Sequence, residues 1–197
     1  MSQIAAVILA GGKAERLGGL NKALIEIGGL RLVDRAIAAA GACSPILLAV
    51  GRSAFEVAGT RAVPDLETDY AGPLAGVVAA VEALEGGGVE FLLSLAVDTP
   101  FFPPDFVARA RPLLQSAPAV LSAFGAQDYP TNALWRLSAI ADLPARLRAG
   151  SAPRSLKRLA EGLGAARLDY AAYGSDNPFA NLNTPDDLAE LRARARQ

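Results

Sequence analysis

The sequence contains no histidine and one cysteine, Cys43. Catalytic triads that need histidine, zinc sites built from histidine and cysteine, and paired redox cysteines are therefore excluded. A lone cysteine cannot form a disulfide within the chain, so nothing argues for an oxidising compartment. We therefore expect a protein of the reducing cytoplasm.

Long hydrophobic runs and a strong charge of one sign are also missing. No apolar run approaches the roughly 18–20 residues of a membrane helix, and the first apolar segment lacks the basic region of a signal peptide. The net charge is −1, which gives no sign of a nucleic-acid surface. The 197 residues are 52% hydrophobic, enough for a core, and we expect a single domain over residues 1–197.

Apolar runs of strand length alternate with segments of helical spacing. This alternation predicts an α/β fold with a mostly parallel sheet and helices on both faces. The expected strands are 4–9, 46–50, 62–63, 89–97, 119–123, 131–135 and 166–170. The expected helices are 32–40, 53–58, 73–84, 105–114, 138–148 and 155–163, with a last one that starts at 185.

The first expected strand runs into the glycine-rich stretch LAGGKAERLGGLNK, residues 9–22. Gly11 and Gly12 lack a Cβ, so the backbone there can adopt a positive φ or approach a ligand closely. Arg16 and Lys22 add positive charge, which favours a phosphate-binding loop. The spacing fits neither the P-loop nor the dinucleotide G-x-G-x-x-G pattern. An ordinary turn with scattered surface charge remains the alternative.

Two aspartates follow expected strands, where open α/β sheets bind ligands. Asp98 ends the most hydrophobic strand, and a carboxylate there is costly unless it is paired or bound to a metal. It is the best candidate ligand for Mg²⁺, which prefers oxygen atoms. Asp65 follows the third strand. The alternatives are an Asx-turn at Asp65 and a loop cap at Asp98.

The run NLNTPDDL near the end of the sequence has the features of a helix start. Thr184 is a suitable N-cap, and Pro185 fits the first helical position. Asn181 and Asn183 alternate along an extended stretch, so we expect their side chains to face the same way. Paired amides there could read a polar ring edge or order the loop.

Four motifs together resemble the molybdenum cofactor guanylyltransferases of the nucleotidyltransferase superfamily: LAGGKAERLGGLNK, DYAGPLAG, DTPFFPPDF and PFANLNTPDDL. The resemblance implies a Rossmann-like sheet of the nucleotide-diphospho-sugar transferase type. It also implies an enzyme that transfers GMP from GTP to molybdopterin and releases pyrophosphate, with Mg²⁺ as cofactor. Molybdoenzymes, or the chaperones that load them, would receive the product.

The same resemblance assigns roles to individual residues. Leu9, Ala10, Gly11 and Gly12 would line the guanine nucleotide, with Asp65 helping to hold it. Arg16 and Lys22 would contact the phosphates, and Asp98 would bind both GTP and Mg²⁺. Asn181 and Asn183 would lie toward the pterin. Arg16, Lys22 and Asp98 are then the expected catalytic residues.

The identity of the nucleotide rests on one position. Similar cytidylyltransferases tend to carry alanine where this chain has Gly11, so the glycine favours guanine. The chain departs from many relatives at Ala49, where they have a nucleotide-contacting asparagine, and at Ala96-Val97, where they have Pro-Cys. Two alternatives therefore stay open: a nucleotidyltransferase that uses CTP or another NTP, and a non-catalytic GTP-binding protein that delivers the cofactor.

Overall fold

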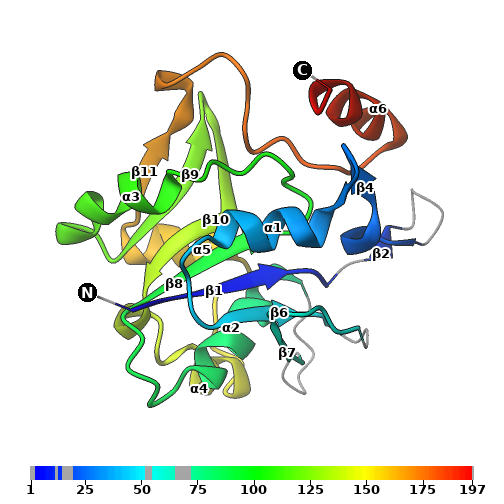
Figure 1. Cartoon of the computed structure of the whole chain (residues 1–197). Helices are drawn as coiled ribbons and strands as arrows, with labels where there is room; N and C mark the ends of the chain where they lie inside the picture. Colours follow the sequence, from blue (N-terminus) through cyan, green and yellow to red (C-terminus); the bar gives the residue numbers. More distant parts are fainter. Residues whose placement is uncertain (1–2, 12, 15–19, 52–54, 65–71, 197) are drawn as a thin grey trace.

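A seven-stranded sheet forms the centre of the molecule (Figure 1). The computed structural model describes residues 3–11, 13–14, 20–51, 55–64 and 72–196, with 13, 14 and 20 described by their backbone alone. The strand order is β11-β9-β10-β8-β1-β6-β7. The bounds are β1 (Ile4–Leu9), β6 (Ile46–Ala49), β7 (Arg61–Val63), β8 (Phe91–Ala96), β9 (Ala119–Phe124), β10 (Gln127–Arg136) and β11 (Ala166–Asp169).

Most neighbouring strands run parallel, as the alternating pattern predicts. The exception is β10, which pairs antiparallel with both β8 and β9. Two short hairpins lie outside the sheet. They pair β2 (Lys13–Ala14) with β3 (Leu20–Asn21) and β4 (Glu26–Ile27) with β5 (Leu30–Arg31).

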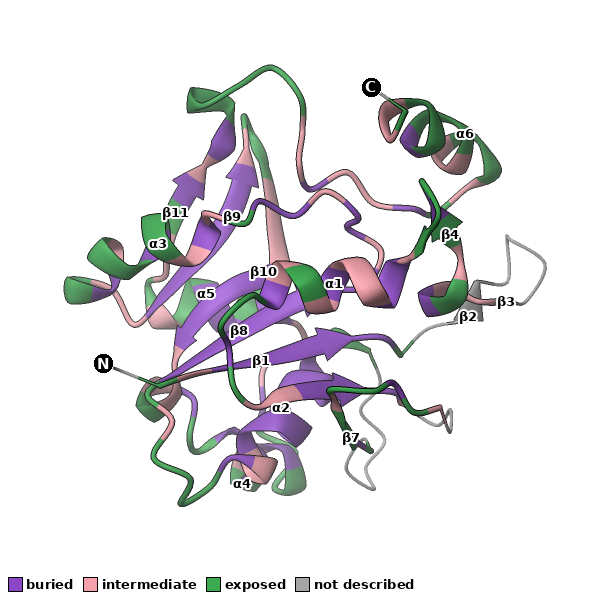
Figure 2. Ribbon diagram, viewed as in Figure 1, coloured by how far each residue is buried: buried purple, intermediate pink, exposed green. Residues whose placement is uncertain are grey.

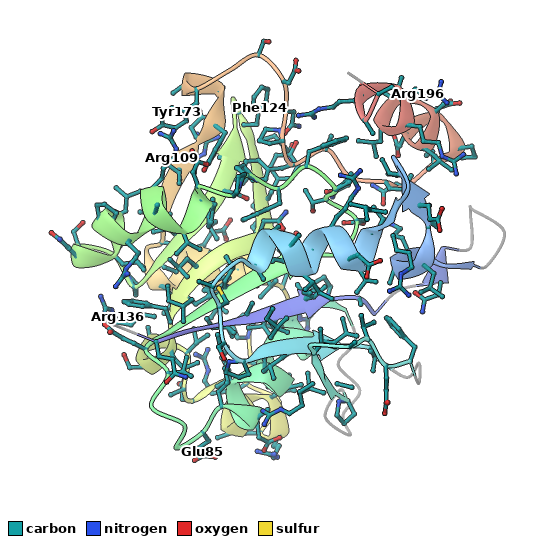
Figure 3. All side chains as sticks on the ribbon, in the orientation of Figure 1. Glu85, Arg109, Phe124, Arg136, Tyr173 and Arg196 are labelled. Carbon is teal, nitrogen blue, oxygen red and sulfur yellow. The ribbon has the colours of Figure 1, made fainter. Side chains whose placement is uncertain are left out.

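Helices cover both faces of the sheet, and this explains why β1 is continuously apolar. Its residues Ala5 and Val7 pack with α2 (Pro73–Ala83), α4 (Leu143–Arg148) and α5 (Leu156–Leu163). Its residues Ala6 and Ile8 point to the face covered by α1 (Leu32–Ala40), α3 (Phe106–Ala110) and α6 (Pro185–Arg194). Figure 2 accordingly shows the central strands as buried. Among the described residues, no helix has the length and apolar character needed to cross a bilayer.

Helix α2 packs very closely on the sheet at Gly76. A Cβ at this position would lie 2.9 Å from both Leu9 Cδ2 and Ala49 Cβ. Leu9 and Ala49 are the last residues of β1 and β6, so the first turns of α2 lie against the carboxyl edge of the sheet. A glycine is therefore needed where the helix meets this edge.

Three expected helices differ from the structure. The one expected at 138–148 is a 3₁₀ segment, Leu137–Ala139, followed by α4, because Pro144 fits the first turn of a helix and not its interior. Residues 55–58 are not helical; Thr60 N–H and Oγ1 donate to the Val57 carbonyl at 3.1 and 2.8 Å, which forms a turn leading into β7. The expected helix 105–114 is α3 followed by a 3₁₀ segment, Arg111–Gln115. Pro112 lacks an N–H and cannot continue the α-helical hydrogen-bond pattern.

Candidate active site

The carboxyl ends of β1, β6 and β8 meet at one edge of the sheet. The Ala10 N–H donates to the Ala49 carbonyl at 2.9 Å, and the Val97 N–H donates to the Leu9 carbonyl at 3.3 Å. The sheet pairing thus continues one residue beyond each strand before the loops leave it. Leu9 and Ala10 are buried and Gly11 is exposed, so the chain emerges at the surface where parallel sheets bind ligands.

Gly11 lies close to the loop that follows β6. Its φ is not in the left-handed region, and a Cβ here would meet the Gly51 N at 3.4 Å. The missing side chain of Gly11 therefore lets the loop after β1 approach the loop after β6 closely. It is not needed for a left-handed backbone conformation. Gly12, Arg16 and Asp65, which the sequence analysis assigns to nucleotide and phosphate, lie outside the described residues.

Lys22 joins three segments that are far apart in the sequence. Its Nζ donates to Asp98 Oδ2 at 2.8 Å and to Asn183 Oδ1 at 3.1 Å. The side chains of Lys22 and Asp98 are 17% and 19% exposed, so the ion pair is mostly shielded from solvent. Such a pair holds both side chains in place, and each charge offsets the cost of burying the other. Three of the residues predicted from the sequence are therefore brought together.

The loop before α6 is tied through the backbone to the loop that follows β8, which carries Asp98 and is called the Asp98 loop below. The Leu182 N–H donates to the Asp98 carbonyl at 3.0 Å, and the Leu182 side chain is fully buried. The residues on either side of it remain at the edge of the site. Asn181 Oδ1 is buried and has no hydrogen-bond partner among the described residues. An unpaired buried acceptor is costly, and a ligand that donates a hydrogen bond would satisfy it.

Helix α6 begins with a capping box, as the TPDD run predicts in part. The Thr184 side chain accepts from the Asp187 N–H at 3.1 Å, and Asp187 Oδ2 accepts from Thr184 N–H at 2.8 Å. The same oxygen accepts from the Asn183 N–H at 2.8 Å. The hydrogen bond from the Asn183 N–H is the largest cause that lowers the pKa of Asp187. The bond from the Thr184 N–H and the charge of Lys22 lower it further. Asp187 thus fixes the residue that contacts Lys22.

Comparisons with known proteins show the family of this chain. Residues 6–165 match the family of MobA-like NTP transferase domains. The chain belongs to this family. A molybdenum cofactor guanylyltransferase of Rhodobacter capsulatus is 38% identical over 200 residues, which cover 99% of this chain and 98% of that protein. The resemblance inferred from the four motifs is confirmed, and the chain is a nucleotidyltransferase.

Solved structures share the fold at low sequence identity. Molybdopterin-guanine dinucleotide biosynthesis protein A of Archaeoglobus fulgidus superposes with a TM-score of 0.73 at 20% identity, covering 98% of this chain and 99% of that chain. A Mycobacterium tuberculosis H37Rv protein in complex with manganese has a TM-score of 0.70 at 16% identity, covering 98% of both chains. The predicted fold of the nucleotide-diphospho-sugar transferase type is confirmed.

The donor atoms at this edge suit a divalent cation that prefers oxygen. Among the described residues, no three His, Cys, Asp or Glu side chains gather as a metal-binding group. The Asp98 carboxylate lies beside the amide oxygen of Asn183, and both accept from Lys22 Nζ. One or two carboxylates completed by substrate phosphates is a common Mg²⁺ arrangement in phosphoryl-transfer enzymes. The residues present fit such a metal.

One buried residue beside the site was missed in the sequence. Asn132 on β10 is fully buried, and its side chain bonds to Ala96 and Thr99, which lie on either side of Asp98. The available signal was an amide side chain inside the apolar run Asn132–Trp135, where a core strand would carry a hydrophobic residue.

Proposed function

We propose that this chain transfers GMP from GTP to the terminal phosphate of molybdopterin. An oxygen of the acceptor phosphate would bond to the α-phosphorus of GTP, and the bond from that phosphorus to the β-phosphate would break, releasing pyrophosphate. The acceptor is a phosphate, already ionised at neutral pH, so the step needs no histidine base. This agrees with a chain that has no histidine.

The observation that carries the proposal is the meeting of Lys22, Asp98 and Asn183 at the carboxyl edge of the sheet. An ammonium, a carboxylate and an amide held within hydrogen-bond distance can position a triphosphate and neutralise its charge. Positioning and charge neutralisation supply most of the catalysis in phosphoryl transfer. In the proposed complex the Lys22 side chain leaves Asp98 and contacts the phosphates. Arg16 would contact the phosphates as well.

The nucleotide would lie along the loop after β1. Leu9, Ala10 and Gly11 are placed there by the pairing with β6 and β8, and Gly11 offers backbone without a side chain. We assign Gly12 and Asp65 to the same nucleotide from the family resemblance. GTP is proposed over CTP because residue 11 is glycine.

We assign Mg²⁺ to Asp98. When bound, the ion would supply positive charge against the oxygens of the reacting phosphate. The protein's own contribution is to present the carboxylate: Asp98 follows a buried strand, and its backbone carbonyl is held by Leu182 N–H. The manganese complex of the M. tuberculosis structural relative is in line with a divalent metal in this fold.

Asn181 and Asn183 are proposed to face the pterin. The buried Asn181 Oδ1 lacks a partner among the described residues, and a pterin ring edge carries the N–H groups that would supply one. A single domain, a cytoplasmic location and delivery of the product to molybdoenzymes or their chaperones stay predictions from the sequence.

The decisive experiment uses purified protein, GTP labelled at the α-phosphate, Mg²⁺ and molybdopterin. The expected result is a labelled dinucleotide together with one pyrophosphate for each product. Thermal shifts with GTP, CTP and UTP at equal concentration identify the nucleotide, because a ligand that binds only the folded state raises stability more the smaller its Kd. GTP binding without pyrophosphate release would instead support a delivery protein.

A further inference from the structure

We propose that Asn132 is a positioning residue that fixes the loop presenting Asp98. The inference rests on the proposed function of Asp98 as metal ligand, and it concerns a side chain that is too deeply buried to touch a substrate. Asn132 is 0% exposed, in the interior of the sheet. Its role would be exerted entirely through the backbone that carries the carboxylate.

The Asn132 side chain bonds to both sides of Asp98. Its Oδ1 accepts from the Ala96 N–H at 2.9 Å, and its Nδ2 donates to Thr99 Oγ1 at 3.2 Å. Thr99 is itself only 4% exposed. One planar amide thus spans the last residue of β8 and the residue after Asp98, and it sets their relative position.

The pairing of the strands explains why a side chain is needed here. Along β8, the Val97 N–H points to β1, so the Ala96 N–H points the other way, toward β10. The β8–β10 pairing stops at Ser94 and Ala133, and β10 is irregular between Tyr129 and Ala133, where it pairs with β9. The backbone ladder ends before Ala96, and Asn132 provides the missing acceptor from within that irregular segment.

A second buried contact between β8 and β10 provides a control. Comparing its loss with the loss of the Asn132 contacts distinguishes an effect on the position of Asp98 from a general loss of stability. The Trp135 Nε1 donates to Ser94 Oγ at 2.9 Å, and Ser94 Oγ donates to the Ala133 carbonyl at 3.4 Å, so these contacts involve neither Ala96 nor Thr99. Loss of either contact leaves a buried polar group without its partner, which lowers stability. Only loss of the Asn132 contacts would release the Asp98 backbone.

The segment that carries Asp98 is then held from two directions. From β10, Asn132 bonds to the Ala96 N–H and to Thr99 Oγ1, on either side of Asp98. From the C-terminal loop, the Leu182 N–H donates to the Asp98 carbonyl. The Asp98 side chain keeps its freedom to exchange Lys22 for a metal, while its Cα does not move. Residues that orient a metal ligand in this way typically contribute ten- to a hundredfold in metal affinity or activity.

The test compares Asn132→Leu, which keeps the number and branching of the side-chain heavy atoms and removes both hydrogen-bonding groups, with Ser94→Ala as the control. Peptide-level hydrogen exchange over residues 95–100, the affinity for Mn²⁺ in the presence of GTP, kcat and KM for pyrophosphate release, and urea unfolding followed by circular dichroism are measured on each. We expect Asn132→Leu to speed exchange in this segment and to weaken Mn²⁺–GTP binding about tenfold or more. Ser94→Ala should lose stability while keeping wild-type metal affinity and kcat.

Equal exchange in residues 95–100 for the two variants, with unchanged Mn²⁺–GTP affinity, would overturn the inference. If Asn132→Leu does not fold, Thr99→Val and Thr99→Ser replace it: the valine should reproduce the defect in part, and the serine should restore wild-type values. A wild-type protein that binds no Mn²⁺–GTP and releases no pyrophosphate would refute the proposed function instead. The exchange comparison would then still decide whether Asn132 holds the loop.

Discussion

The ammonium of Lys22 lies 2.8 Å from the carboxylate of Asp98, and the two residues are separated by 76 positions in the sequence. The cation expected to hold phosphates therefore neutralises the anion expected to hold the metal. A metal–nucleotide complex would bring negative phosphates to Lys22 and a positive metal ion to Asp98. Binding of nucleotide and of metal should consequently depend on each other.

Replacing Lys22 by methionine tests this exchange. The variant should bind nucleotide more weakly, because a phosphate contact is lost. It should bind Mn²⁺ alone more tightly, because no ammonium competes for Asp98; a gain of roughly 1 kcal/mol corresponds to about fivefold. Free Mn²⁺ measured by electron paramagnetic resonance gives the affinity. Unchanged or weaker binding of the metal alone would contradict the competition.

The second prediction concerns Asp98→Asn, which keeps the shape of the side chain and removes its charge. Turnover should fall about a hundredfold or more, because charge stabilisation at the reacting phosphate is lost. The fold should be retained, since the amide can still contact Lys22. Pyrophosphate release and thermal unfolding check the two parts separately. Normal turnover by the purified variant would refute the metal assignment.

Gly76→Ala tests the close packing of α2 on the sheet. The new Cβ would lie 2.9 Å from Leu9 and Ala49 side-chain atoms, so the variant should lose about 1–3 kcal/mol of unfolding free energy. Gly162→Ala is the matched control: Gly162 lies in α5 with nothing within 4 Å of the added Cβ. That change should stabilise the protein by up to about 1 kcal/mol, because alanine favours a helix. Urea unfolding of both variants distinguishes crowding from helix propensity.

The capping box of α6 should make stability depend on acid pH. The pKa of Asp187 is lowered in the folded state, so its contribution is present above the unfolded pKa of about 3.9 and is lost as pH falls through the folded value. Asp187→Asn should therefore be less stable than wild type at pH 6, and the difference should shrink toward pH 3. Urea midpoints at the two pH values measure it.

Asp186→Asn serves as the control for that experiment. It removes a charge from the same helix turn, which favours acidic residues in general. The capping hydrogen bonds among the described residues belong to Asp187. A wild-type advantage over Asp187→Asn that is equal at both pH values would show that the carboxylate charge is not involved.

Local patterns predicted the elements of the fold well where the cause was local. The buried strand at 4–9, the helix that ends at Gly41 and the helix that begins after Thr184 are all confirmed. Each depends on apolar spacing or on a capping residue that the sequence displays directly. The error at 55–58 has the opposite cause: a short segment with weak periodicity took the form of a turn.

The contacts of the site depend on tertiary structure and could be predicted only in outline. The sequence pointed to Lys22, Asp98 and Asn183 individually, through strand ends and the family resemblance. That Lys22 bonds to Asn183 depends on how the C-terminal loop returns to the sheet, 161 residues along the chain, and its contact with Asp98 depends on how β1 and β8 pair. The amide in an apolar strand marked Asn132 as unusual, but its contacts to Ala96 and Thr99 depend on the irregular pairing of β10 and could not be read from the sequence.

The return of the C-terminal loop has a consequence for shortened chains. The seven strands of the described sheet end at Asp169, whereas Leu182 and Asn183 supply contacts to Asp98 and Lys22. A chain truncated between these two points would contain every strand of that sheet and would lack the residues that anchor Asp98 and Lys22 from the C-terminal side. Possession of the whole sheet is therefore a poor measure of whether the proposed site is intact.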